Sequence, residues 1–190
     1  PELEVFAQEH DLKIGTIADL IEYRNLNETT IEKVAECDLP TEFGDFRLHT
    51  FKDVIDEQLH YALVKGDVAV SEPALVRVHL HNTFSDLLGS TRGVNRSMNL
   101  PKAMARIGAE GGVLVLLGAK ENFEQQVQQF AAEDRGEAAA GKGWEGSSRT
   151  VGVGSQILVS LGVKQMKLLS KPVKYSGLSG YGLEVVEYIS

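Results

Sequence analysis

Cysteine is almost absent from this sequence: Cys37 is the only one among 190 residues. A disulfide framework needs pairs of cysteines, and a zinc site built from thiolates alone needs three or four of them. Both are therefore excluded.

Long apolar runs and clusters of basic residues are also missing. The longest apolar run, residues 113–118, is far too short to cross a bilayer, and no segment has the features of a signal peptide. The net charge is −8, with acidic residues spread along the chain. These absences argue against a nucleic-acid-binding or membrane protein and favour a cytoplasmic one.

One short stretch stands out because its apolar and polar side chains alternate strictly. Residues 76–81 read "VRVHLH", and the polar members are Arg77, His79 and His81. Alternation with a period of two is typical of a strand with one buried face. The sequence therefore predicts that the guanidinium and both imidazoles project from the same side of a strand.

Two interpretations of this polar face are open. Two imidazoles one residue apart on a strand lie about 6.5–7 Å from each other, so His79 and His81 could share a metal ion. Alternatively, the face is solvated or hydrogen-bonded within the protein. We favour the second interpretation, because the sequence shows no third ligand.

The remaining periodicity predicts an α/β fold. A short helix is expected over residues 1–10, and Gly and Pro punctuation separates the later elements. We expect strands at 46–51, 60–65, 75–81, 113–117, 166–169 and 183–188, and helices at 99–107, 121–136 and 154–161. Strands dominate the first half and alternate with helices in the second, which indicates a mixed sheet flanked by helices.

Several segments carry a resemblance to a known family. The runs "LVRVH" and "LGSTR", and "GSQILVSLGV" and "GLSGYGLEVVE" within residues 151–190, resemble GTP cyclohydrolase II of riboflavin synthesis. Residues 6–24 resemble the tail of 3,4-dihydroxy-2-butanone 4-phosphate synthase, which in many bacteria is fused upstream of that enzyme. The resemblance implies a synthase tail at 1–30, a linker at 31–43 and a layered GTP cyclohydrolase II-like domain at 44–190.

The departures from the family pattern affect its metal site. The family's zinc loop holds the metal through three cysteines, and their positions here are Asn82, Gly93 and Asn95. A glycine offers no ligand, and an amide is a poor ligand for zinc. Zinc in this family activates the water that opens the purine ring. We therefore expect no metal ligands and no cofactor.

Other family motifs are also degraded. The arginine-rich motif that should follow the apolar strand is replaced by "GAKENFEQQ", and Phe130 stands in place of the family's tyrosine. In the family's D-x-R-D motif, Arg149 is retained whereas the two acids are replaced by Ser147 and Thr150. The hydroxyl, the acids and most of the cationic groups of the family's site are therefore lost.

Five residues still match positions that the family uses. The resemblance implies that Arg149 attacks or clamps the nucleotide phosphate, although a surface arginine near a helix start is an equal alternative. It also makes Arg77, His79, Ser170 and Lys174 remnant nucleotide-binding candidates. For Ser170 and Lys174 the alternative is ordinary turn chemistry.

Three functional hypotheses follow. The leading one is an inactive GTP cyclohydrolase II-like domain that serves the fused synthase as a structural, regulatory or dimerising partner. The second is an active GTP cyclohydrolase II, which would convert GTP to a diaminopyrimidine, formate and pyrophosphate. The third is a module that senses GTP or a related nucleotide without chemistry. The resemblance also implies a homodimer.

Overall fold

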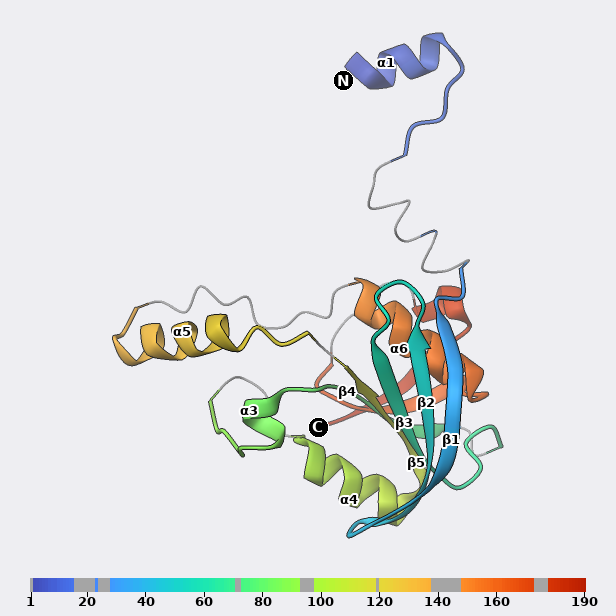
Figure 1. The fold of residues 1–190 in the computed structure, drawn as a ribbon. Coiled ribbons are helices and arrows are strands. Elements are labelled where there is room, and N and C mark those ends of the chain that lie inside the picture. The colour runs from blue at the N-terminus through green and yellow to red at the C-terminus, as the bar shows by residue number, and fades with distance from the viewer. Residues whose placement is uncertain are drawn as a thin grey trace.

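The computed structural model describes residues 2–15, 23, 28–70, 73–92, 98–118, 120–137, 148–172 and 178–190. Within these ranges the chain forms a mixed seven-stranded sheet with helices against it (Figure 1). The strands are β1 (Ile31–Thr41), β2 (Gly44–Asp53), β3 (Leu59–Lys65), β4 (Ala74–Leu80), β5 (Gly112–Leu117), β6 (Gln165–Leu169) and β7 (Glu184–Ile189). The helices are α1 (Glu2–Glu9), α3 (Thr83–Asp86), α4 (Leu100–Glu110), α5 (Phe123–Asp134), α6 (Ser148–Ser160) and the 3-10 helix η1 (Leu178–Tyr181).

The sheet combines an antiparallel half with a parallel half. Its strand order is β1-β2-β3-β5-β4-β6-β7, and the pairings from β1 to β5 are antiparallel whereas those from β5 to β7 are parallel. The α/β fold with a mixed sheet and a short N-terminal helix is therefore confirmed. The two strands that best test this prediction, β4 and β5, lie side by side at the centre of the sheet.

Two helices cover opposite faces of the sheet and bury separate cores. Helix α6 packs Val153, Ile157 and Leu158 against one face, where Val76 of β4 also lies. Helix α4 packs Ala103 and Ile107 against the other face, together with Leu75. Alternation along β4 therefore points its even-numbered side chains toward α6 and its odd-numbered ones toward α4. None of the helices in the described ranges is both long and apolar enough to span a membrane.

Residues 31–43 are not the linker predicted from the sequence, because most of them form strand β1. Only Ile31 is buried among Ile31–Thr41, and a register shift between Lys33 and Ala35 interrupts the alternation. An edge strand with two exposed faces needs no apolar periodicity, since backbone pairing with β2 holds it in place. The synthase tail at 1–30 and the domain at 44–190 stay predictions.

Helix α4 contains Gly108, and we expect its replacement by alanine to destabilise the protein, although alanine usually stabilises a helix. A β-carbon on Gly108 would lie 2.0 Å from the carbonyl oxygen of Phe43, in the turn between β1 and β2. Propensity alone predicts that Gly→Ala in a helix stabilises by about 1 kcal/mol. We expect Gly108→Ala instead to lower the free energy of unfolding by about 1–3 kcal/mol, measured by urea denaturation.

The matched control for this prediction is Gly154→Ala in α6. There the closest atom to the new β-carbon is Cγ1 of Val78 at 3.4 Å, an ordinary contact with a side chain that can adjust. We expect this variant to be as stable as the wild type or slightly more stable. Equal stability of the Gly108→Ala and Gly154→Ala variants would contradict the packing of α4 against the turn.

Candidate functional site

The polar side chains of β4 are buried on the face of the sheet that α4 covers. Arg77 and His79 are each only 9% exposed. The guanidinium of Arg77 donates through Nη1 to the carbonyl oxygen of Leu169 at 2.6 Å and through Nη2 to that of Met98 at 3.1 Å. Arg77 therefore ties β4 to the end of β6 and to the segment that leads into α4.

His79 is held by a buried carboxylate from the single-turn helix α3. Its Nε2 lies 2.9 Å from Oδ2 of Asp86, whose side chain is 5% exposed. Oδ2 also accepts the backbone N–H of Asn82 at 2.9 Å, and Oδ1 accepts the hydroxyl of Ser85 at 3.0 Å. Asp86 is thus surrounded by three donors from its own turn and from β4.

The charge states of this pair follow from burial and these donors. Burial lowers the pKa of His79, and this effect outweighs the opposing influence of Asp86. Burial alone would raise the pKa of Asp86, but the N–H of Asn82, the imidazole and the Ser85 hydroxyl together hold it below its usual range. At neutral pH a neutral His79 therefore donates a hydrogen bond to an ionised Asp86.

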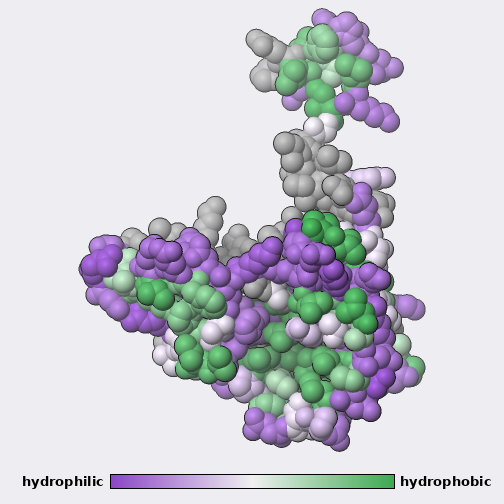
Figure 2. Space-filling model, viewed as in Figure 1, coloured by the Kyte–Doolittle hydropathy of each residue, from purple (hydrophilic) through white to green (hydrophobic). Residues whose placement is uncertain are grey.

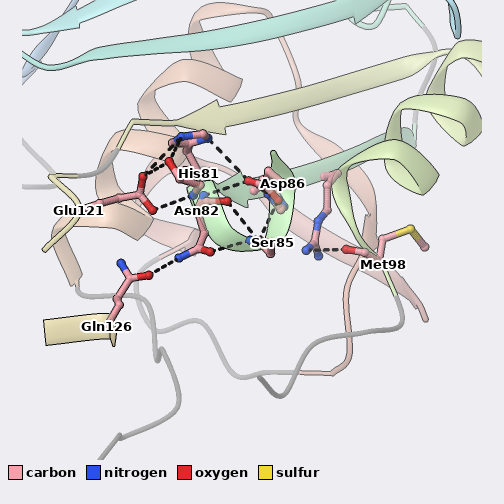
Figure 3. A network of polar contacts seen from close by, with 10 residues as sticks. His81, Asn82, Ser85, Asp86, Met98, Glu121 and Gln126 are labelled. Atoms are coloured by element: carbon pink, nitrogen blue, oxygen red, sulfur yellow. Dashed lines mark hydrogen bonds and ion pairs between the residues drawn. The ribbon is translucent and has the colours of Figure 1, made fainter. Parts of the chain in front are cut away.

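The second imidazole lies between two carboxylates. His81 Nδ1 is 3.7 Å from Oδ2 of Asp86, and His81 Nε2 is 3.6 Å from Oε2 of Glu121 (Figure 3). Glu121 precedes α5 and accepts both the backbone N–H and the hydroxyl of Thr83, at 2.7 and 2.5 Å. The network thus runs from β4 through α3 to the start of α5.

Asn82 occupies the junction between α3 and α5. Its side-chain oxygen accepts the backbone N–H of Ser85 at 3.0 Å and caps α3, while its amide nitrogen donates to Oε1 of Gln126 at 3.0 Å (Figure 3). The amide therefore uses both its donor and its acceptor to hold two helices at the end of β4.

Comparison with known proteins identifies the family. A family model described as GTP cyclohydrolase II matches residues 32–190. The chain belongs to the GTP cyclohydrolase II family. It is 49% identical over 195 residues to a protein of Photobacterium phosphoreum named 3,4-dihydroxy-2-butanone 4-phosphate synthase, covering 100% of this chain and 51% of that protein. It is 40% identical over 202 residues to riboflavin biosynthesis protein RibBA of Mycobacterium avium, covering 99% and 47%.

A solved structure agrees with this assignment. The crystal structure of RibBX, a two-domain 3,4-dihydroxy-2-butanone 4-phosphate synthase from A. baumannii, superposes with a TM-score of 0.69 at 36% identity. The match covers 99% of this chain and 48% of that one. The chain therefore spans about half the length of the relatives that it matches.

The described residues do not fit the zinc ion that a GTP cyclohydrolase II-like site implies. Among them, no three His, Cys, Asp or Glu side chains are grouped to hold a metal ion. Asn82, which stands at a cysteine position of the family pattern, is committed to helix capping and to Gln126. Gly93 and Asn95, the other two positions, lie outside the described residues. The absence of zinc stays a prediction.

The structure separates the remaining candidates. Arg149 lies in the first turn of α6 and pairs through Nη2 with Asp53 at 2.9 Å and Asp56 at 3.1 Å, away from the network around Asp86. Ser170 follows β6, donates its hydroxyl to the carbonyl oxygen of Lys171 at 3.0 Å, and lines a cavity of about 60 Å³ on the α6 side. Lys174 lies outside the described residues.

Two carboxylates that organise the site, those of Asp86 and Glu121, were not among the residues predicted from the sequence. Asp86 follows Asn82 by four residues, and Asn82 caps the short helix between them. In such a capped turn a nearby acid can accept the backbone N–H of the capping residue. This local signal could have found Asp86. Glu121 gives no comparable signal, because it reaches Thr83 from 38 residues away in sequence.

Proposed function

We propose that this GTP cyclohydrolase II-like domain does not hydrolyse GTP and instead serves as a structural or regulatory partner of a 3,4-dihydroxy-2-butanone 4-phosphate synthase domain in a riboflavin-biosynthesis protein. The observation that carries the proposal is the use of Asn82. A residue at a position where the family pattern has a zinc-binding cysteine here caps α3 and binds Gln126.

The surrounding network supports the same conclusion. Hydrolysis by a zinc enzyme needs a metal with an open position for the reacting water. His79, His81, Asp86 and Glu121 instead contact one another or nearby hydroxyl and amide groups. Side chains arranged in this way stabilise the end of β4. They are not arranged to bind a metal ion that would activate a water molecule.

The names of the relatives support the synthase part of the proposal. Proteins of Photobacterium phosphoreum and Pseudomonas aeruginosa, 49% and 44% identical to this chain, are named for the synthase. RibBX is titled a two-domain synthase, and the present chain matches about half of it. These observations favour a second domain that accompanies a synthase domain. A homodimer stays a prediction.

A nucleotide-sensing role has less support. The guanidinium of Arg77 is bound by two backbone carbonyl groups, and that of Arg149 is bound by two carboxylates. Both arginines therefore already have partners inside the domain.

The test of the supporting role is heat inactivation of the synthase reaction in the full-length protein. If this domain stabilises the synthase, Gly108→Ala should shorten the half-life of synthase activity at elevated temperature, whereas Gly154→Ala should not. Indistinguishable half-lives for the two variants, when only the first destabilises this domain, would contradict the proposal.

A further inference from the structure

The turn between β2 and β3 exposes two adjacent apolar side chains. Val54 is 55% exposed and Ile55 is 57% exposed. Turn tips usually carry Gly, Asn, Asp, Ser or Pro, and β-branched apolar residues favour strands instead. Figure 2 shows hydrophobic atoms at this end of the domain, beside the point where the chain enters it.

The turn that presents these side chains is held firmly in place. Asp53, only 1% exposed, accepts the backbone N–H of Ile55 at 2.8 Å and Arg149 Nη2 at 2.9 Å. Arg149 also pairs with Asp56 at 3.1 Å. Glu57 adopts a left-handed backbone conformation, with φ of 60°, and its N–H donates to the carbonyl oxygen of Asp53 at 2.9 Å.

A rigid exposed contact loses little conformational freedom when a partner covers it. Arg149, the arginine retained from the family motif, is one of the residues that make this turn rigid. It pairs with Asp53 and Asp56 and takes no part in the polar network around Asp86.

The chain enters the domain directly beside the turn. The backbone N–H of Val54 donates to the carbonyl oxygen of Thr30 at 2.9 Å, and the N–H of Thr30 donates to Oε1 of Gln156 at 2.7 Å. A domain that precedes residue 28 is therefore joined to this one at a point beside Val54 and Ile55. Such a tether gives it a high effective concentration at this surface.

We propose that Val54 and Ile55 are a docking contact for the synthase domain that precedes this one. This inference rests on the proposed function, which attaches a synthase to this chain. The relatives of this chain are about twice as long as the chain itself, and RibBX has two domains. The additional length is enough for a second domain, which could cover Val54 and Ile55. A second copy of the GTP cyclohydrolase II-like domain is the competing occupant.

The test is photo-crosslinking in the full-length protein. Ile55 is replaced by p-benzoylphenylalanine, and the linked peptides are identified by mass spectrometry. The matched control places the same group at Val70, an exposed apolar residue (78%) in the turn after β3. We expect links from position 55 to synthase peptides at a yield about tenfold above that from position 70.

Two results would overturn the docking proposal. One is a yield from position 55 no higher than from position 70. The other is linkage to peptides of residues 28–190 of a second copy. Neither result bears on GTP turnover or zinc content, so failure of the docking contact is distinguishable from failure of the proposed function.

Discussion

Replacing Arg77 with methionine is expected to lower the free energy of unfolding by about 2–4 kcal/mol. Arg77 is 9% exposed, and its guanidinium donates to the carbonyl oxygens of Leu169 and Met98. Methionine preserves much of the apolar stem but removes both hydrogen bonds, which leaves two backbone acceptors without this partner. Hydrogen bonds from charged donors are the stronger class, and a buried group that loses its partner pays a desolvation cost.

Urea denaturation of this chain, followed by circular dichroism, measures the effect of Arg77→Met. The matched control is Arg106→Met, because Arg106 lies on α4 and pairs with Glu110 through an exposed contact. We expect the control to change stability little. A variant at position 77 as stable as the control would contradict the role of Arg77 as a structural tie.

Replacing Asp86 with alanine is expected to lower the free energy of unfolding by about 2–4 kcal/mol, because buried donors lose a charged acceptor. Its carboxylate is bound to His79, to the N–H of Asn82 and to the hydroxyl of Ser85. Removal of the carboxylate leaves a buried imidazole and a backbone N–H without their acceptor. Because the same turn carries Asn82, the contact between α3 and α5 should also loosen.

The Asp86→Ala effect should depend on pH in a defined direction. The folded pKa of Asp86 lies below its ordinary value, so the ionised carboxylate contributes stability above that ordinary value, near pH 4. This contribution is lost as the pH falls through the folded pKa. The stability difference between wild type and variant, measured by urea denaturation, should therefore shrink in acid. A difference that is constant from pH 7 to pH 3 would contradict the assigned charge state.

A suitable control for this variant is Asp134→Ala. The side chain of Asp134 is 62% exposed and pairs with Arg92 at the surface, so its removal should have little effect at any of these pH values.

Strands with one clear pattern were predictable, and the edge of the sheet was not. The alternation at 76–81 placed β4 and put Arg77 and His79 on one face. The same alternation predicted only one buried face, whereas both faces of β4 are buried and the polar side chains are hydrogen-bonded inside the protein. Strand β1 gave no such signal, since its side chains are exposed on both faces and its stability comes from pairing with β2. Backbone pairing leaves no trace in side-chain periodicity.

The candidate site was predictable only where its members are close in sequence. His79 and Asn82 were identified through the family pattern. Gln126 of α5 reaches Asn82, and Glu121, just before α5, reaches Thr83 and His81, only through tertiary packing. Arg149 shows the opposite case. The family motif predicted a place beside the nucleotide, which stays a prediction. The ion pairs of Arg149 with Asp53 and Asp56, which fix it at the turn between β2 and β3, carry no signal in the motif.

The most direct test of the account measures zinc content and GTP turnover together on the purified full-length protein. Zinc is counted per chain by elemental mass spectrometry, and formation of the diaminopyrimidine product is followed by its absorbance. A family member that retains the three cysteines serves as the positive control. We expect far less than one zinc per chain and no product above background. One zinc per chain together with GTP turnover would contradict this expectation.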